Sequence, residues 1–362
     1  MVEFKKNKIF EEKTKPESGR NKEGHIGVAN NPGVAKFKAE ITNNSSISSK
    51  DISNLKKELK VSIFGQVMTK EEISKIPDIT LTVSKEIMEG NIVNHGELTL
   101  LFPDVLKKLK TLNENLGFSR ITSLDDNQIE ILSKNKGCLY LDGLTSINDN
   151  QAESLSRHKG VLCLRGLTSI NDNQAESLSR HKEGLHLDGL TSINDNQAES
   201  LSKHKRELSL LGLTSLTDSQ AESFSKHKGW LWLDGLTSIP DNQVELLSKK
   251  EGGLSLAGLT SFTDNQIKLL SKHKGDLSLN GLTSIPDNQV ELLSEHEGEL
   301  SLDNLSSLTD NQAKSLSKHK GKLSLHGLTS LTEKQAEMLS KHKGNIFLNY
   351  IDFSKLIEKY KK

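Results

Sequence analysis

Hydrophobic positions recur with one constant period along most of this chain. The pattern L-x-L-x-G-L-T-S-I-x-D-N-Q-A-E-x-L-S-K-H-K-G begins at Leu116, Leu139 and Leu162 and returns at the same interval up to Leu323, without insertion or deletion. A fixed period in this range is typical of a solenoid, in which each repeat packs only on its neighbours. Ten full repeats are therefore predicted over residues 116–345, and Ile346 begins a partial eleventh.

Each repeat predicts one strand and one helix. The alternation L-x-L favours a short strand with one buried face, and A-E-x-L between Asp-Asn-Gln and Lys-His-Lys-Gly has helical spacing and helical end signals. Asn148 stands three residues before Gln151, which predicts a capping box, and Pro240 and Pro286 weaken that prediction in their repeats. The glycine after each strand, such as Gly143, is expected to adopt a positive φ.

The strand, the 23-residue period and the "LTSI" step resemble leucine-rich repeats, particularly a bacterial class with a T-S-I element before an alanine-containing helix. The resemblance implies an α/β fold: a right-handed leucine-rich-repeat solenoid with a parallel β-sheet on the concave face and short helices on the convex face. This chain lacks the asparagine ladder of the commonest form of the family. A glutamine recurs at the helix start instead, and either a polar ladder between repeats or helix capping explains it. These glutamines are Gln128, Gln151, Gln174, Gln197, Gln220, Gln243, Gln266, Gln289, Gln312 and Gln335.

The segments outside the repeats are interpreted from composition and weaker patterns. Strand-like runs begin at Val61, Ile79 and Leu98, so they follow one another at a shorter interval than the strands of the regular repeats. The predicted divisions are a flexible polar arm (1–49), an amino-terminal cap with degenerate 18–19-residue repeats (50–115), ten 23-residue repeats (116–345), and a carboxy-terminal cap of a strand and a helix (346–362).

The exposed face of the predicted sheet is where the repeats differ most. The residues before, between and after the two strand leucines are expected to point outward. The segment "GLTSINDNQAESLSRHK" is identical from Gly143 and from Gly166, whereas the adjacent strands read "CLYLD" and "VLCLR". This divergence predicts a recognition surface, and drift at unpacked positions is the alternative. The candidate partner-binding residues are Tyr140, Arg165, His186, Asp188, Leu211, Trp230, Trp232 and Asp234.

Both tryptophans of the chain, Trp230 and Trp232, belong to one strand and are expected to point outward. The small residues of the next strand, Gly253 and Ser255, are expected to leave the rings exposed. Paired aromatic side chains of this kind are typical of binding hot spots. The alternative is that the two indoles lie flat over Gly253 and Ser255 and only cover backbone.

A histidine recurs at one place in the repeats. We expect these side chains at the helix C-terminal edge beside the lysines, where they bond the last carbonyls; a basic, anion-binding edge is the alternative, and metal binding is disfavoured. Eight like charges would then accumulate below about pH 6, and stability should fall. The histidines are His158, His181, His204, His227, His273, His296, His319 and His342, with Asn135 and Lys250 at the same place in other repeats.

Composition narrows the functional classes. The 48 basic and 48 acidic residues cancel, which gives no reason to expect nucleic acid as the partner. We find no signal-like apolar region and no apolar run near the ~20 residues needed to cross a bilayer, so a cytoplasmic protein is expected, with secretion as an effector left open. Cys138 and Cys163, two residues out of register on adjacent strands, are expected to be free thiols.

No phosphate-binding glycine loop or metal-ligand spacing is found, so we expect no enzyme, no catalytic residue, no cofactor and no metal site. The predicted function is a non-catalytic, monomeric protein–protein interaction scaffold that binds a protein partner on the concave face. The alternatives are a polyanion- or cell-surface-binding adhesin or effector that uses the basic helix-end edge, and a passive spacer.

Overall fold

The computed structural model of the protein describes residues 60–63, 66–69, 98–111, 114–349 and 351–360, and the single positions 72, 75, 76, 80 and 84. The chain divides into two units, and the repeats all lie in the second, Ile63–Gln66 and Glu71–Lys362. The polar arm predicted over residues 1–49 lies outside the described residues.

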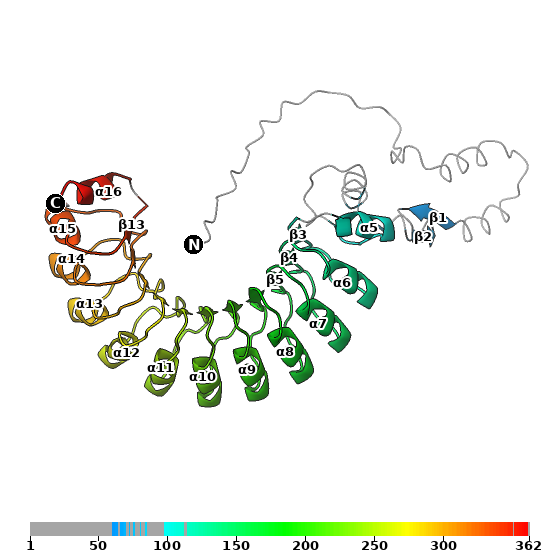
Figure 1. Cartoon of the computed structure of the whole chain (residues 1–362), viewed down its shortest axis with the longest axis horizontal. Coiled ribbons are helices and arrows are strands. Elements are labelled where there is room, and N and C mark those ends of the chain that lie inside the picture. The colour runs from blue at the N-terminus through cyan, green and yellow to red at the C-terminus, as the bar shows by residue number, and fades with distance from the viewer. Residues whose placement is uncertain are drawn as a thin grey trace, which may run out of the picture. The chain divides into compact units, whose positions relative to one another are not determined.

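Eleven short strands form one parallel sheet in which sequence neighbours are also spatial neighbours. Equivalent leucines pair across the strands, as in Leu139 with Leu162 and Leu208 with Leu231. Within the array the strands line the inner side of an arc (Figure 1). The strands are β3 (Leu116–Gly117), β4 (Leu139–Tyr140), β5 (Leu162–Cys163), β6 (Leu185–His186), β7 (Leu208–Ser209), β8 (Leu231–Trp232), β9 (Leu254–Ser255), β10 (Leu277–Ser278), β11 (Leu300–Ser301), β12 (Leu323–Ser324) and β13 (Ile346–Phe347).

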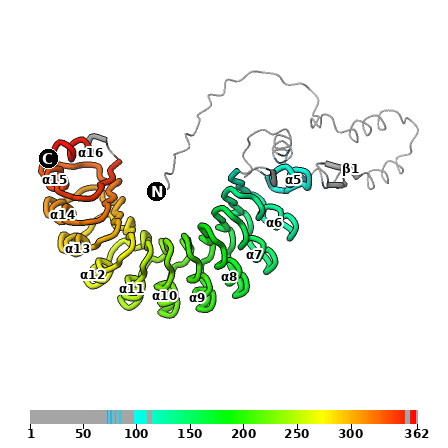
Figure 2. The backbone as a smooth tube through the Cα atoms, in the orientation of Figure 1, coloured from blue at the N-terminus to red at the C-terminus, as the bar shows by residue number. Residues whose placement is uncertain are grey.

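One short helix follows each strand from β3 to β12 and lies on the outer side of the same arc (Figure 1). The backbone takes the same course in each repeat (Figure 2). The strand and the helix that were predicted for each repeat are therefore confirmed. The helices are α6 (Asp126–Leu132), α7 (Asp149–Ser156), α8 (Asp172–Ser179), α9 (Asp195–Ser202), α10 (Asp218–Ser225), α11 (Asp241–Ser248), α12 (Asp264–Leu270), α13 (Asp287–Leu293), α14 (Asp310–Leu316) and α15 (Glu333–Leu339).

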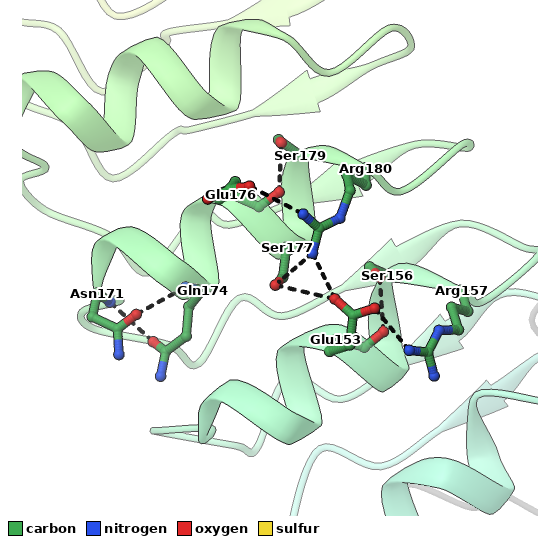
Figure 3. A network of polar contacts seen from close by, with 9 residues as sticks. All are labelled: Glu153, Ser156, Arg157, Asn171, Gln174, Glu176, Ser177, Ser179 and Arg180. Carbon is green, nitrogen blue, oxygen red and sulfur yellow. Dashed lines mark hydrogen bonds and ion pairs between the residues drawn. The ribbon is translucent and has the colours of Figure 1, made fainter.

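The recurring glutamine has both of the roles that the sequence left open. In α8 the Asn171 side chain accepts from the Gln174 backbone N–H at 2.8 Å, and the Gln174 side chain accepts from the Asn171 N–H at 3.0 Å (Figure 3). The Gln174 amide also donates to the Ile147 carbonyl of the preceding repeat at 2.9 Å. The helices that begin after Pro240 and Pro286, where the prediction of a cap was weaker, have no side-chain cap. The glutamine therefore starts its own helix and ties it to the previous repeat.

The core is a column of leucines shared between neighbouring repeats. Leu139, Leu141 and Leu155 have no exposed surface, and Ala152 lets the helix approach the sheet closely. Burial of one leucine side chain stabilises the fold by about 1.5–3 kcal/mol. Since each repeat buries these side chains against the next, stability comes from stacking of neighbours.

The glycine after each strand is required for a different reason than the one predicted. Neither Gly143 nor Gly166 has a φ in the left-handed region, so the expectation of a positive φ is wrong. A Cβ on Gly166 would lie 2.4 Å from the Asp142 carbonyl oxygen and 2.5 Å from that of Leu144. Glycine is needed because successive repeats bring their backbones into direct contact.

Of the strand-like runs expected before the array, the one from Val61 is a strand, and the other two differ where the structure describes them. Two short strands, β1 (Lys60–Ile63) and β2 (Gln66–Thr69), form a separate two-stranded sheet. The strand expected from Ile79 is wrong at Thr80, which is helical, and residues 98–102 contain no strand although Leu98, Leu101 and Phe102 are buried. Helix α5 (Pro103–Thr111) follows them. The extent of the amino-terminal cap remains a prediction.

Helix α16 (Ile351–Glu358) follows β13 at the other end of the array. Its Ile357 is buried, and Lys359, just beyond the helix, pairs with Glu333 of α15 at 3.2 Å. This helix therefore packs on the last repeat.

Candidate functional site

The in-register sheet arranges the outward side chains of its inner face in rows. Equivalent positions before, between and after the strand leucines lie side by side on neighbouring strands, because Leu208 pairs with Leu231 and the other repeats follow the same register. The middle row runs from Tyr140 through Cys163, His186 and Ser209 to Trp232.

Three aromatic side chains form a layer over β6 to β8, which we call the aromatic ledge (His186, Trp230 and Trp232). The ring centroids of Trp230 and Trp232 are 5.6 Å apart with an interplanar angle of 19°. Those of His186 and Trp232 are 6.1 Å apart at 21°. Ser209, which lies on the strand between them, is only 2% exposed. The sequence placed these residues on one face but did not predict the contact across two strands.

Trp230 covers part of the next strand. A Cβ added at Gly253 would lie 2.3 Å from Cδ2 and Cε2 of Trp230, so the ring lies directly over this glycine. Both Trp230 and Trp232 are nevertheless half-buried rather than buried. The rings therefore shelter backbone and also present surface to the inner face.

A network of charged groups adjoins the ledge. The Arg165 guanidinium lies between Asp188, 3.0 Å from its Nε, and Asp142, 3.5 Å from its Nη1. Asp188 also accepts a hydrogen bond from the Ser209 hydroxyl and one from the Leu211 N–H at 3.4 Å. Exposed ion pairs contribute only about 0–1 kcal/mol to stability. Their effect here is to hold side chains of β5, β6 and β7 in one arrangement.

Burial alters the ionisation of several groups on this face. It lowers the pKa of His186, so the ledge carries no charge at neutral pH. Burial also raises the pKa of the Cys163 thiol to about 12 and the pKa of Tyr140 above its usual value. Both cysteines are free, as predicted, and the buried Cys163 remains a thiol at neutral pH.

The remaining candidate residues lie on the same face at different distances from the ledge. Leu211 of the β7 repeat is 39% exposed. Asp234 follows Trp232 on the same strand, and its carboxylate accepts the Ala257 N–H at 3.0 Å. Tyr140 is half-buried on β4, two strands away from His186.

The charged side chains at the outward positions of β6 to β11 are all acidic, a feature that the sequence interpretation missed. They include no lysine or arginine among the described residues. The sequence contains this information, because the repeat register identifies the outward positions of each strand and hence the acidic residues among them. The carboxylates are Asp188, Glu207, Asp234, Asp276, Glu299 and Asp303.

No family model and no curated protein matches this sequence. Among solved structures, an internalin of Listeria monocytogenes matches with 15% identity and a TM-score of 0.41, over 70% of this chain and 73% of that one. A chain of the Toll–Spatzle complex of Drosophila matches with 14% identity and a TM-score of 0.41, over 65% and 39%. A leucine-rich repeat protein of Leptospira interrogans matches with 15% identity and a TM-score of 0.36, over 76% and 90%.

The architecture itself decides the fold. Eleven parallel strands, with leucines in register and a helix after each of the first ten, recur with the period of the sequence pattern. The fold is a leucine-rich repeat solenoid. Its sheet forms the inner face, and its helices form the outer side.

The recurring histidines are buried between the repeats of the solenoid. They follow the helix ends, as predicted, but their exposed fractions are only 0–4%, so they form no exposed basic edge. They form two columns, His158 to His227 and His273 to His342, with ring centroids 5.9–6.2 Å apart and ring planes within 9° of parallel. Their side chains point into the gap between repeats, while the flanking lysines point out.

The expected bond to the last helical carbonyls is present in several repeats, and it crosses to the preceding helix. Nδ1 of His158 lies 3.2 Å from the Ser133 carbonyl oxygen at the end of α6, and His227 lies 3.3 Å from that of Ser202. Burial lowers the pKa of the histidines from His158 to His319, to about 4 for His181, His227 and His319. The histidines therefore add no positive charge to the edge at neutral pH.

Lys250 separates the two columns. It occupies the histidine position, has no exposed surface, and donates its ammonium to the Gly229 carbonyl of the preceding repeat. Burial lowers its pKa to about 8. The gap between repeats therefore accommodates a cation in one place.

A hollow at the helix-end edge is lined by both acidic and basic side chains. A hollow of about 600 Å³ is lined by Glu153, Ser156, Arg157, His158, Lys159, Arg180, Lys182 and Glu183. Glu153 pairs with Arg157 at 2.7 Å and with Arg180 at 2.6 Å (Figure 3). These two guanidinium groups hold the pKa of Glu153 below its usual value. Both arginines are thus already paired with carboxylates.

Among the described residues, no group of three or more His, Cys, Asp or Glu side chains could hold a metal ion. No helix in the same part of the chain is long and apolar enough to span a membrane.

Proposed function

We propose that this protein is a non-catalytic protein–protein interaction scaffold, whose partner binds the inner face of the sheet between Tyr140 and Asp234. The observation that carries the proposal is the aromatic ledge. It places half-exposed rings of His186, Trp230 and Trp232 in one layer near the middle of the sheet. Large aromatic side chains with few rotatable bonds are enriched at interface hot spots.

Two further features support this site. The outward residues vary from strand to strand, whereas the helix and loop segments from Gly143 and Gly166 are identical. The bonds of Asp188 to Arg165, Ser209 and Leu211 fix the polar side chains beside the ledge before any partner arrives. Such preorganisation lowers the entropic cost of association.

The second candidate is binding of a polyanion or a cell surface at the helix-end edge. The hollow with exposed Lys159 and Lys182 favours it. The carboxylates of Glu153 and Glu183 in the same hollow oppose it, because they repel anions and Glu153 already pairs with both arginines. We therefore place the binding site on the inner face.

The proposal is tested by affinity capture from native lysate with three forms of the full chain: wild type, Trp230→Ala/Trp232→Ala, and Lys159→Ala/Lys182→Ala. Circular dichroism and thermal unfolding verify that the forms fold alike. Captured proteins that disappear with the tryptophan variant and remain with the lysine variant are the expected result. Equal recovery of every captured protein with the tryptophan variant would overturn the proposal, and a loss restricted to the lysine variant would favour the edge.

A further inference from the structure

We infer that the aromatic ledge receives a lysine or arginine side chain, so that the protein partner presents a basic segment to the inner face. This inference rests on the proposed function and names the chemistry of the partner. It is carried by the carboxylates at outward positions on the strand of the two indole rings and on nearby strands.

Carboxylates lie on both sides of the indole rings. Glu207 is the neighbour of Trp230 in the same row, because Leu208 pairs with Leu231. Asp234 lies two residues beyond Trp232 on the same strand and the same face. Asp276 follows in the row of Trp230 on the far side of Gly253, which has no side chain to intervene. Outward positions on β7, β8 and β10 therefore each hold a carboxylate, on the strand that bears the indole rings and on strands to either side of it.

These carboxylates differ from Asp188 and Glu299, on the same face, in having no lysine or arginine partner. Asp188 pairs with Arg165 at 3.0 Å, and Glu299 pairs with Lys322 at 3.3 Å. Within the described residues no ion pair is found for Glu207, Asp234 or Asp276. Asp234 and Asp276 accept only backbone N–H groups, of Ala257 at 3.0 Å and of Glu299 at 2.9 Å.

An indole ring with adjacent carboxylates is suited to a cation. Indole is the aromatic group that attracts cations most strongly, and a guanidinium can also stack on its face. A purely apolar partner surface would remove water from Glu207, Asp234 and Asp276 without providing compensation, which is costly. An acidic partner would be repelled. The contact that satisfies both the rings and the carboxylates is therefore a lysine or arginine side chain.

Binding at the ledge can be followed by the intrinsic fluorescence of its two tryptophans. They are the only tryptophans in the chain, so tryptophan emission responds directly to the ledge. The full-length protein is titrated with a capped glycine–serine peptide that carries two arginines, with the same peptide carrying two lysines, and with the same peptide carrying two glutamates. Each titration is repeated for Glu207→Gln/Asp234→Asn and for the control Glu299→Gln, whose carboxylate pairs with Lys322.

We expect a saturable change in emission with the arginine and lysine peptides and none with the glutamate peptide. The double variant should weaken binding about three- to fivefold for each carboxylate removed, and Glu299→Gln should leave it unchanged. Added salt should weaken binding further. Thermal unfolding verifies that the amide variants, which change exposed or half-exposed side chains, remain folded.

Three results would overturn the inference: no response to either basic peptide, an equal response to the glutamate peptide, or unchanged affinity in the double variant. Its failure can be told apart from failure of the proposed function. If captured partners need Trp230 and Trp232 but not Glu207 and Asp234, the function stands and the basic segment is excluded. If captured partners bind without the tryptophans, the inner-face function itself fails.

Discussion

Gln197 donates its side-chain amide to the Ile170 carbonyl of the preceding repeat at 2.8 Å, and its own side-chain oxygen accepts the Asn194 N–H at 2.9 Å. One largely buried side chain thus bonds both a backbone N–H at the start of its own helix and a backbone carbonyl of the preceding repeat. The same arrangement recurs along the solenoid and couples each helix to its neighbour.

Gln197→Ala should therefore lower the free energy of unfolding by about 1–3 kcal/mol, because it leaves a buried carbonyl and a helix N–H without partners. Urea denaturation followed by circular dichroism measures the change. Glu199→Ala on the same helix is the control, since it removes only an exposed pair with Lys203 and should cost less than about 0.5 kcal/mol. Equal stabilities of the two variants would contradict the role of the glutamine.

Gly166→Ala should destabilise the solenoid by about 1–3 kcal/mol, because the new Cβ would lie within 2.5 Å of the carbonyl oxygens of Asp142 and Leu144. Gly184→Ala is the matched control, since its nearest neighbours would be Glu207 at 3.3 Å and Val161 at 3.5 Å. That change should be neutral or slightly stabilising. Thermal unfolding of both variants distinguishes contact between repeats from a general intolerance of alanine.

Acidification should destabilise the fold through the buried histidine columns. The folded-state pKa of His181 is lowered to about 4, so below about pH 6.5 the unfolded chain binds protons that the folded chain does not. Stability is therefore highest above pH 6.5 and falls as the pH drops toward 4, by at most roughly 1.4 kcal/mol per pH unit for each such histidine. Urea denaturation at pH 7.5, 6.0 and 5.0 measures this slope.

His181→Asn provides the control for this slope, because Asn135 occupies the same place in the first repeat. The variant should show a shallower loss of stability between pH 7.5 and 5.0 than the wild type. A slope identical to that of the wild type would place the acid sensitivity elsewhere in the chain.

Lys250→His should stabilise the solenoid at pH 7.5 by about 1–3 kcal/mol. The substitution removes a buried cation and joins the columns that end at His227 and begin at His273. The pKa of Lys250 is lowered to about 8 in the folded state, so wild-type stability should rise as the pH increases from about 8 to 10.5. The variant should lack this rise. Thermal unfolding at pH 7.5 and 9.5 checks both statements, and a less stable variant at pH 7.5 would contradict the account.

The regular part of the fold was predictable because its pattern repeats without interruption. Ten copies of one pattern determine where strands and helices alternate, and the register follows because equivalent leucines such as Leu139 and Leu162 must share one core. The burial of the histidines was missed for a physical reason. His181 lies between Arg180 and Lys182, and such a polar run looks exposed, yet only the histidine is buried between the repeats.

The sequence predicts which face of the sheet bears the candidate site, but not how the side chains of the site contact one another. Sequence periodicity places His186, Trp230 and Trp232 on the same side of the sheet, but the stacking of His186 on Trp232 depends on how far both rings lean over Ser209. The position of Trp230 over Gly253 is likewise a matter of side-chain rotamer. The carboxylates near the ledge could have been found from the sequence, by reading the equivalent outward positions of successive strands.

The central claim is that a protein partner binds the inner face at the ledge, and calorimetric titration tests it most directly. A captured partner, once purified, is titrated into the wild type, into Trp230→Ala/Trp232→Ala and into Lys159→Ala/Lys182→Ala. Loss of a hot spot should raise the dissociation constant of the tryptophan variant about 30-fold or more, while the lysine variant binds as the wild type does. Equal affinities of the wild type and the tryptophan variant would contradict the claim.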